Sequence, residues 1–155
     1  MRLMIRKGLM TRDAFFRVYH HLKRRFPESP FVFHFRWATD GGIQPGLCHP
    51  FPIDRRRRIL MARQPSNVKI AVAHNGVIPK WSGLGGDVSD TLLYVQNDLA
   101  PAFEADSTFL RNPSNRKQMA IETASRWAFL TNHGQLCAVG PFYRYDDLYY
   151  SKPLR

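Results

Sequence analysis

Hydrophobic and polar residues recur with two different periods at the start of this chain, and each period predicts an element. In "RLMIRKG" (residues 2–8), Leu3 and Ile5 alternate with basic residues, which predicts a short strand with one solvent-facing side. In "TRDAFFRVYHHLKRRF" the apolar residues recur every three to four positions. We therefore expect a helix that is capped by Thr11 and ends before Pro27, with cations in its last turn.

Two later segments are typical of buried strands. Phe31–Trp37 is rich in aromatic and β-branched residues, and Ile70–Ala73 is an apolar run that ends near the turn dipeptide Asn75-Gly76. Both segments finish in polar residues beside glycine. Polar residues do not contribute to a hydrophobic core, so we expect a functional site at the ends of these strands.

The second half of the chain predicts two helices and an antiparallel meander. "SDTLLYVQNDL" should be helical, with Asp87 or Ser89 as its cap, and "SNRKQMAIETAS" should form the next helix. "RWAFLT", the turn "NHG", "QLCAVG" and "YRYDDLYYS" then predict the meander, in which we expect the tyrosines to pack. The fold class is therefore α+β with layered sheets, in a single domain that spans residues 1–155.

Composition and charge restrict the class of partner. Of the 155 residues, 44% are hydrophobic and 13% aromatic, which is enough for a globular core and excludes a disordered chain. The net charge of +11 attracts polyanions or acidic small molecules. The sharpest concentration is "RRRRILMAR", where Arg55, Arg56, Arg57 and Arg58 form either a solvated loop or a phosphate-binding patch. Because this stretch has no aromatic residue to stack on a base, only non-specific contact with nucleic acid is expected there.

Several classes of protein and site are excluded. Cys48 and Cys137 have neither metal-site nor disulfide spacing, and no metal or cofactor is expected. No apolar run reaches the length of a membrane span, and the N-terminus has no signal-peptide pattern, so we expect a cytoplasmic protein.

The polar residues at the strand ends have the chemistry to hold an α-amino acid. Arg36 could bind a carboxylate, Asp90 an ammonium, and the Asn75 amide with the Gly76 N–H could face a developing oxyanion. The alternatives are that Arg36 pairs with a buried carboxylate, that Asn75-Gly76 is an ordinary turn, and that Asp90 is a first-turn helix acid. We interpret the histidines at 34 and 74 as hydrogen-bonded core residues.

The motifs "HFRWATDG", "CHPF", "VAHNGVI" and "SDT" occur in an order and spacing that resembles the glutaminase domain of class II, N-terminal-nucleophile, glutamine amidotransferases. The closest resemblance is to small stand-alone members of bacterial or phage type, and it covers nearly the whole chain. The resemblance implies a four-layer αββα sandwich in the cytoplasm of a bacterial or phage-infected cell, with no cofactor and with a synthetase as a possible partner.

The resemblance also implies roles for individual residues. Arg36, with help from Thr39, would bind the α-carboxylate of glutamine, and Asp90 would bind its α-amino group. Asn75 and Gly76 would form the oxyanion hole. The reaction of the family is attack by an N-terminal cysteine on the side-chain amide, which gives a glutamyl thioester and ammonia, and then glutamate.

The sequence departs from the family pattern in two ways. Asp40 stands where the family has histidine, and the chain begins Met1-Arg2 instead of with the cysteine whose α-amino group activates the thiol. We do not expect Cys48 or Cys137 to replace it. The family's first strand is then missing, which should leave a sheet edge unpaired.

Three interpretations follow. The first is a class II glutamine amidotransferase-like domain that is either shortened by a misplaced start codon or degenerate. It would be a glutaminase in a full-length form with an upstream cysteine and inactive as written. The second is a pseudo-enzyme that binds an amino acid or a protein partner. The third is a basic, nucleic-acid-associated phage protein.

Overall fold

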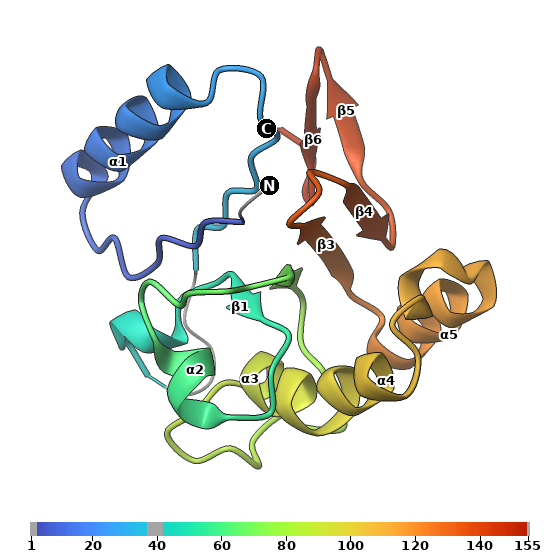
Figure 1. The fold of residues 1–155 in the computed structure, drawn as a ribbon. Helices are drawn as coiled ribbons and strands as arrows, with labels where there is room; N and C mark the ends of the chain where they lie inside the picture. The colour runs from blue at the N-terminus through green and yellow to red at the C-terminus, as the bar shows by residue number, and fades with distance from the viewer. Residues whose placement is uncertain (1–2, 37–41, 155) are drawn as a thin grey trace.

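A four-stranded antiparallel sheet forms the centre of the computed structural model, which describes residues 3–36 and 42–154 (Figure 1). The strands lie in the order β1–β2–β3–β4, and Val72 is opposite Phe129 in the register of the central pair. This arrangement confirms the α+β class. The strands are β1 (Phe51–Pro52), β2 (Ile70–Asn75), β3 (Arg126–Thr131) and β4 (Leu136–Val139).

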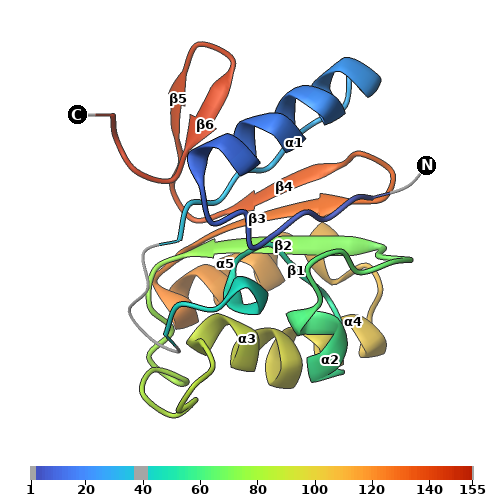
Figure 2. The ribbon, with the colours of Figure 1, turned by 90° about the vertical axis from the view of Figure 1, so that its left-hand side faces the viewer.

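One face of the sheet packs against a layer of helices (Figure 2). The layer contains α3 (Asp90–Tyr94), a π-helical segment η2 (Val95–Leu99), α4 (Ala100–Ala105) and α5 (Pro113–Thr123). Val72, Trp127 and Phe129 project from the sheet into the main core and are fully buried. The two helices predicted in this half of the chain are confirmed, and the cap of the first is Ser89, whose Oγ accepts from the Leu92 N–H at 3.2 Å.

The opposite face of the sheet is covered in part by the N-terminal segment. Leu3 and Ile5 pack with Ala71 of β2 and Leu130 of β3 in a second, smaller cluster. The predicted strand in residues 2–8 is wrong for the described residues, since residues 3–8 lie in no strand. Burial nevertheless alternates along this segment: Leu3, Ile5 and Lys7 are buried, whereas the residues between them are partly exposed.

Lys7 is 3% exposed, although its side chain is charged in water. Its Nζ donates to the Gly46 carbonyl at 2.8 Å and to the Leu60 carbonyl, and it lies 4.2 Å from the centroid of the Phe51 ring. Loss of hydration lowers the pKa of Lys7 to about 7.

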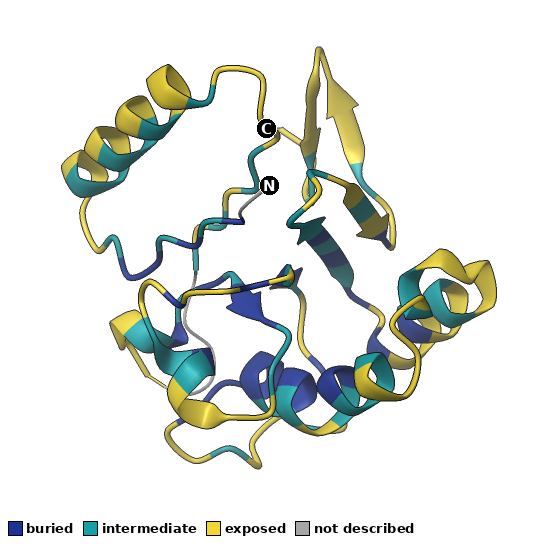
Figure 3. Ribbon diagram, in the orientation of Figure 1, coloured by how far each residue is buried: buried dark blue, intermediate teal, exposed yellow. Residues whose placement is uncertain are grey.

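Helix α1 (Arg12–Arg25) forms where the sequence predicts it, and the Thr11 Oγ accepts from the Ala14 N–H at 3.2 Å as its cap. None of its 14 residues is buried (Figure 3). The helix is therefore a peripheral element, held above the sheet on the side away from α3 and α5 (Figure 2).

The prediction of a buried strand at Phe31–Trp37 is wrong for its described part. Residues 31–36 lie in no strand, Phe33 is 46% exposed and Phe35 is 76% exposed. Aromatic composition favours a strand only where a partner strand is available for pairing, and none of the strands of the described chain pairs with this segment.

The two hairpins of the predicted meander are confirmed, but they do not form one continuous sheet. β3 pairs with β4, whereas β5 (Tyr143–Tyr145) and β6 (Leu148–Tyr150) form a separate two-stranded sheet. Gly140, with φ +86°, lies at the break. The expected packing of the tyrosines is limited, because Tyr149 is 62% exposed and Tyr145 mainly contacts Tyr150, at 5.7 Å between ring centroids. The remaining short elements are η1 (Pro45–Leu47), α2 (Arg57–Met61) and η3 (Phe109–Arg111).

Candidate functional site

The candidate site begins where β2 ends, at Asn75 and Gly76. Gly76 has φ +150°, and a Cβ at this position would lie 2.1 Å from the Ser125 Oγ, so no side chain fits there. The Asn75 Nδ2 donates to the Ser151 Oγ at 2.6 Å. This bond holds the Asn75 amide beside the C-terminal segment and leaves its second N–H hydrogen available.

Asp90 opens α3 and joins it to the loop that follows β2. Its side chain is buried, with Oδ2 accepting from the Ile78 N–H at 2.7 Å and Oδ1 from the Thr91 N–H at 2.6 Å. A carboxylate at the first turn also suits the helix dipole. The interpretation of Asp90 as a first-turn acid therefore has direct structural support, and its role in binding an amino group stays a prediction.

Three histidines from separate parts of the sequence meet at the end of β2. The His34 Nε2 lies 2.9 Å from the His74 carbonyl oxygen, and the rings of His34 and His49 are 4.0 Å apart between centroids. The His74 N–H also donates to the His49 Nδ1 at 3.4 Å. The segment 31–36 is thus placed beside β2, as the site prediction requires, although without strand pairing.

The hydrogen bonds of His74 fix its tautomer. The Thr91 Oγ donates to the Asp90 Oδ1 at 3.2 Å, so it accepts from the Nδ1–H of His74, which lies 2.8 Å away. The Nε2 of His74 then carries a lone pair, and this buried atom has no partner in the described part of the chain. It lies 3.3 Å from the place where a Cβ on Gly76 would stand. A buried acceptor of this kind can receive a hydrogen bond from an amide, an ammonium or a water molecule.

All three imidazoles are neutral at neutral pH. Burial lowers the pKa of His34 to about 4 and that of His74 to about 3, and it lowers the pKa of His49 well below its usual value. In residues 3–36 and 42–154, no group of three or more histidine, cysteine, aspartate or glutamate side chains is placed to hold a metal ion. The cluster is therefore a set of neutral hydrogen-bonding groups, which agrees with the core interpretation of His34 and His74.

Arg36 follows His34 by two residues, and its Nη1 donates to the Gly42 carbonyl at 2.6 Å. Thr39 and Asp40, the other predicted members of this part of the site, lie outside the described residues. One cavity of the described chain lies between α1 and the N-terminal segment and another lies among the α3–α5 layer, so neither is lined by Arg36, Asn75 or Asp90. The convergence of Arg36, Asn75 and Asp90 on one small space stays a prediction.

The two cysteines differ in their surroundings, because Cys48 lies close enough to Lys7 for an electrostatic interaction, whereas Cys137 is partly buried. The Cys48 thiol donates weakly to the Gln44 carbonyl at 3.9 Å, and burial raises the pKa of the Cys137 thiol. The expectation that neither replaces an N-terminal cysteine stays a prediction.

Sequence reasoning missed His49 and Lys7 as parts of this region. The signal for His49 was its position in "CHPF", one of the four motifs, and the signal for Lys7 was the continued alternation after Ile5. Both residues are separated from β2 by more than twenty positions in sequence, so no local pattern brings them to it.

Comparison with known proteins adds no assignment: no protein-family model, no curated protein and no solved structure matches this chain. In the part of the chain that the structure describes, no helix has both the length and the apolar character needed to cross a bilayer.

Proposed function

We propose that this chain is a class II glutamine amidotransferase-like domain with the four-layer αββα sandwich of that family, and that its site binds glutamine. The observation that carries the proposal is the contact of 2.9 Å between the His34 Nε2 and the His74 carbonyl. This contact joins the "HFRWATDG" and "VAHNGVI" motifs, which are 40 residues apart in sequence, and so it supports a shared site.

In the proposed complex, each polar group recognises one part of the ligand. The Arg36 guanidinium and the Thr39 hydroxyl bind the α-carboxylate, and the Asp90 carboxylate accepts from the α-ammonium. The Asn75 amide and the Gly76 N–H donate to the side-chain carbonyl oxygen. A glycine is required at this position because the Ser125 side chain occupies the place of a Cβ.

The proposed reaction of a full-length form requires a thiol that this sequence does not supply at its N-terminus. A cysteine sulfur attacks the amide carbon of glutamine, the carbon–nitrogen bond breaks, and ammonia leaves with the proton of the thiol. Water then cleaves the thioester to give glutamate and regenerates the thiol. The oxyanion hole at Asn75 and Gly76 stabilises the negative oxygen in both steps.

The second candidate is a pseudo-enzyme that uses the same site for binding only. Burial raises the pKa of the Cys137 thiol, which disfavours its use as a nucleophile and so favours this candidate. The ligand would be an amino acid or a segment of a protein partner, for which a synthetase is one possibility.

Calorimetry with L-glutamine tests the binding proposal. We expect saturable binding to the wild-type chain and at least about tenfold weaker binding to Arg36→Ala, the loss typical of a charge-assisted hydrogen bond. Arg56→Ala is the matched control, because its guanidinium pairs with Asp54 at 2.7 Å and the residue belongs to none of the four motifs. Absence of binding, or equal loss in both variants, would refute the proposal.

Release of glutamate from glutamine separates the two candidates. A chain extended so that a free N-terminal cysteine precedes Met1 should release glutamate, and the chain as given should not. Binding without hydrolysis in both forms would identify a pseudo-enzyme, whereas hydrolysis in both would contradict the need for an N-terminal thiol.

A further inference from the structure

Helix α1 concentrates positive charge, and no acid of the described residues forms an ion pair with it. It carries one acid, Asp13, against five basic residues: Arg12, Arg17, Lys23, Arg24 and Arg25. None of the ion pairs found in residues 3–36 and 42–154 involves a residue of α1. Its cations remain available to a polyanion.

The arginine run that the sequence marks as the candidate phosphate patch is different. Arg55 pairs with Glu104 at 2.8 Å, Arg56 with Asp54 at 2.7 Å, and Arg57 with Asp87 at 3.5 Å. Three of its four cations are thus held by acids of the same chain. Because these arginines are paired, α1 is a better candidate than this run for binding a polyanion.

The inner side of α1 borders a basic cavity. The cavity has a volume of about 310 Å³ and lies between the helix and the N-terminal segment. Arg6, Arg17, His21 and Arg25 contribute its polar groups, and no acidic residue lines it. Guanidinium groups of this kind bind phosphate oxygens by paired hydrogen bonds.

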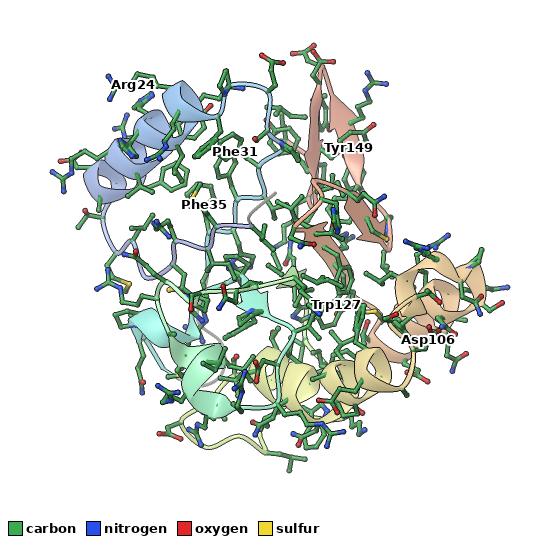
Figure 4. The ribbon with its side chains drawn as sticks, in the orientation of Figure 1. Arg24, Phe31, Phe35, Asp106, Trp127 and Tyr149 are labelled. Atoms are coloured by element: carbon green, nitrogen blue, oxygen red, sulfur yellow. The ribbon has the colours of Figure 1, made fainter. Side chains whose placement is uncertain are left out.

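Exposed aromatic rings lie beside the same helix. Phe33 and Phe35 are 46% and 76% exposed, and their centroids lie 5.5 Å and 5.1 Å from that of Phe15 on α1 (Figure 4). Phe16 is also 40% exposed, with the Arg12 guanidinium 5.6 Å from its centroid. The rings are therefore fixed on one side by the helix and open to solvent on the other.

We propose that α1 and residues 31–35 bind single-stranded nucleic acid. The phosphates contact Arg6, Arg17 and Arg25, and unpaired bases stack on Phe33 and Phe35. Sites for single strands combine cations with exposed rings, because every nucleotide carries a charge and every base has a face that can stack. Here both features adjoin α1. A duplex would satisfy only the cations, since its bases already stack on one another.

Fluorescence anisotropy of a labelled single strand of about 12 thymidines, a length within the usual site sizes, tests this proposal. We expect Phe35→Ala to weaken binding at least about fivefold, the lower limit for loss of one stacked base. The matched control is Tyr149→Ala, which removes another largely exposed ring, on β6, and should leave the affinity unchanged.

Salt titration isolates the charges. Arg17→Ala with Arg25→Ala should reduce the slope of log affinity against log salt by about 0.7 for each phosphate that the protein no longer neutralises. Arg56→Ala with Arg57→Ala removes the same charge from paired positions and should change the slope less. Equal slopes in the two double variants would overturn the assignment of the phosphates to α1.

A second copy of this chain is the competing occupant of the ring surface. Sedimentation should show a monomer at the concentrations of the anisotropy experiment. A dimer that Phe35→Ala dissociates, together with strand binding that does not respond to Phe35→Ala, would overturn the proposal in favour of self-association. Equal affinity for duplex and single strand would overturn it as well.

Discussion

Helices α1 and α3 differ in the contacts that hold them to the rest of the molecule. Four of the five residues of α3 are buried, including Leu92 and Tyr94, whereas none of the 14 residues of α1 is. α3 is fixed by its contacts with the sheet, and α1 by ring contacts such as the one between Phe15 and Phe33. The comparison teaches that an apolar stripe predicts a helix without predicting how deeply it is buried.

The difference in burial between α1 and α3 also separates a region that provides stability from a region that is available for binding. Hydrophobic burial, which provides most of the stability of a domain, is concentrated between the sheet and the α3–α5 layer. The α1 region contributes exposed rings and unpaired charge instead. Substitutions in the first region should therefore change stability, and substitutions in the second should change binding.

The largest expected contrast is between Trp127→Ala and Phe16→Ala. Trp127 is fully buried, and its Nε1–H donates to the Thr123 Oγ at 2.9 Å, so its removal should lower the free energy of unfolding by about 3–5 kcal/mol. Phe16 is 40% exposed, and its removal should cost less than about 1 kcal/mol. Urea denaturation measures both, and equal costs would contradict the division of roles.

A contrast of intermediate size concerns pH. Burial lowers the pKa of His34 from 6.5 to about 4, so as the pH falls the unfolded chain binds its proton first. The stability from the neutral ring is complete above pH 6.5 and is lost as the pH falls towards 4. We expect His34 to contribute about 1–3 kcal/mol to the fall in the free energy of unfolding over this window, in addition to the contributions of His49 and His74.

The variant His34→Phe sharpens this test. Its free energy of unfolding should fall less steeply between pH 7 and pH 4 than that of the wild type. Phe129→Leu is the control, since it removes buried surface and no titratable group, and its slope should match the wild type. A wild-type slope in His34→Phe would show that this histidine is not the source.

The smallest expected contrast is between the two helix caps. Ser89→Ala removes the buried acceptor of the Leu92 N–H and should cost about 1–2 kcal/mol in the free energy of unfolding. Thr11→Ala removes an exposed cap and should cost at most about 0.5 kcal/mol, because α1 contributes little to the global core. Thermal denaturation of both variants checks the order, and a larger loss for Thr11→Ala would reverse the comparison.

Local patterns predicted the elements whose partners are near in sequence. α1 followed from its period and its Thr11 cap, and β3 and β4 from two alternating runs around one turn. The segment 31–36 was mispredicted because its aromatic residues favour a strand, while pairing depends on a distant neighbour that no local pattern specifies.

The sequence indicated which residues to consider for the candidate site, but not the hydrogen bonds that they form. Motif order brought attention to His34, Asn75 and Asp90, and the structure links His34 to the end of β2. The sequence did not indicate that main-chain N–H groups would already occupy both oxygens of Asp90, because those bonds depend on how the loop after Gly76 returns to α3.

Titration of ¹⁵N-labelled protein with L-glutamine, followed by NMR, tests the proposed glutamine site most directly. The account predicts saturable shifts of the Gly76 main-chain amide and the Asn75 side-chain amide, with the amides of α1 unchanged. Shifts that are absent at Gly76 and Asn75, or that appear only along α1, would contradict it.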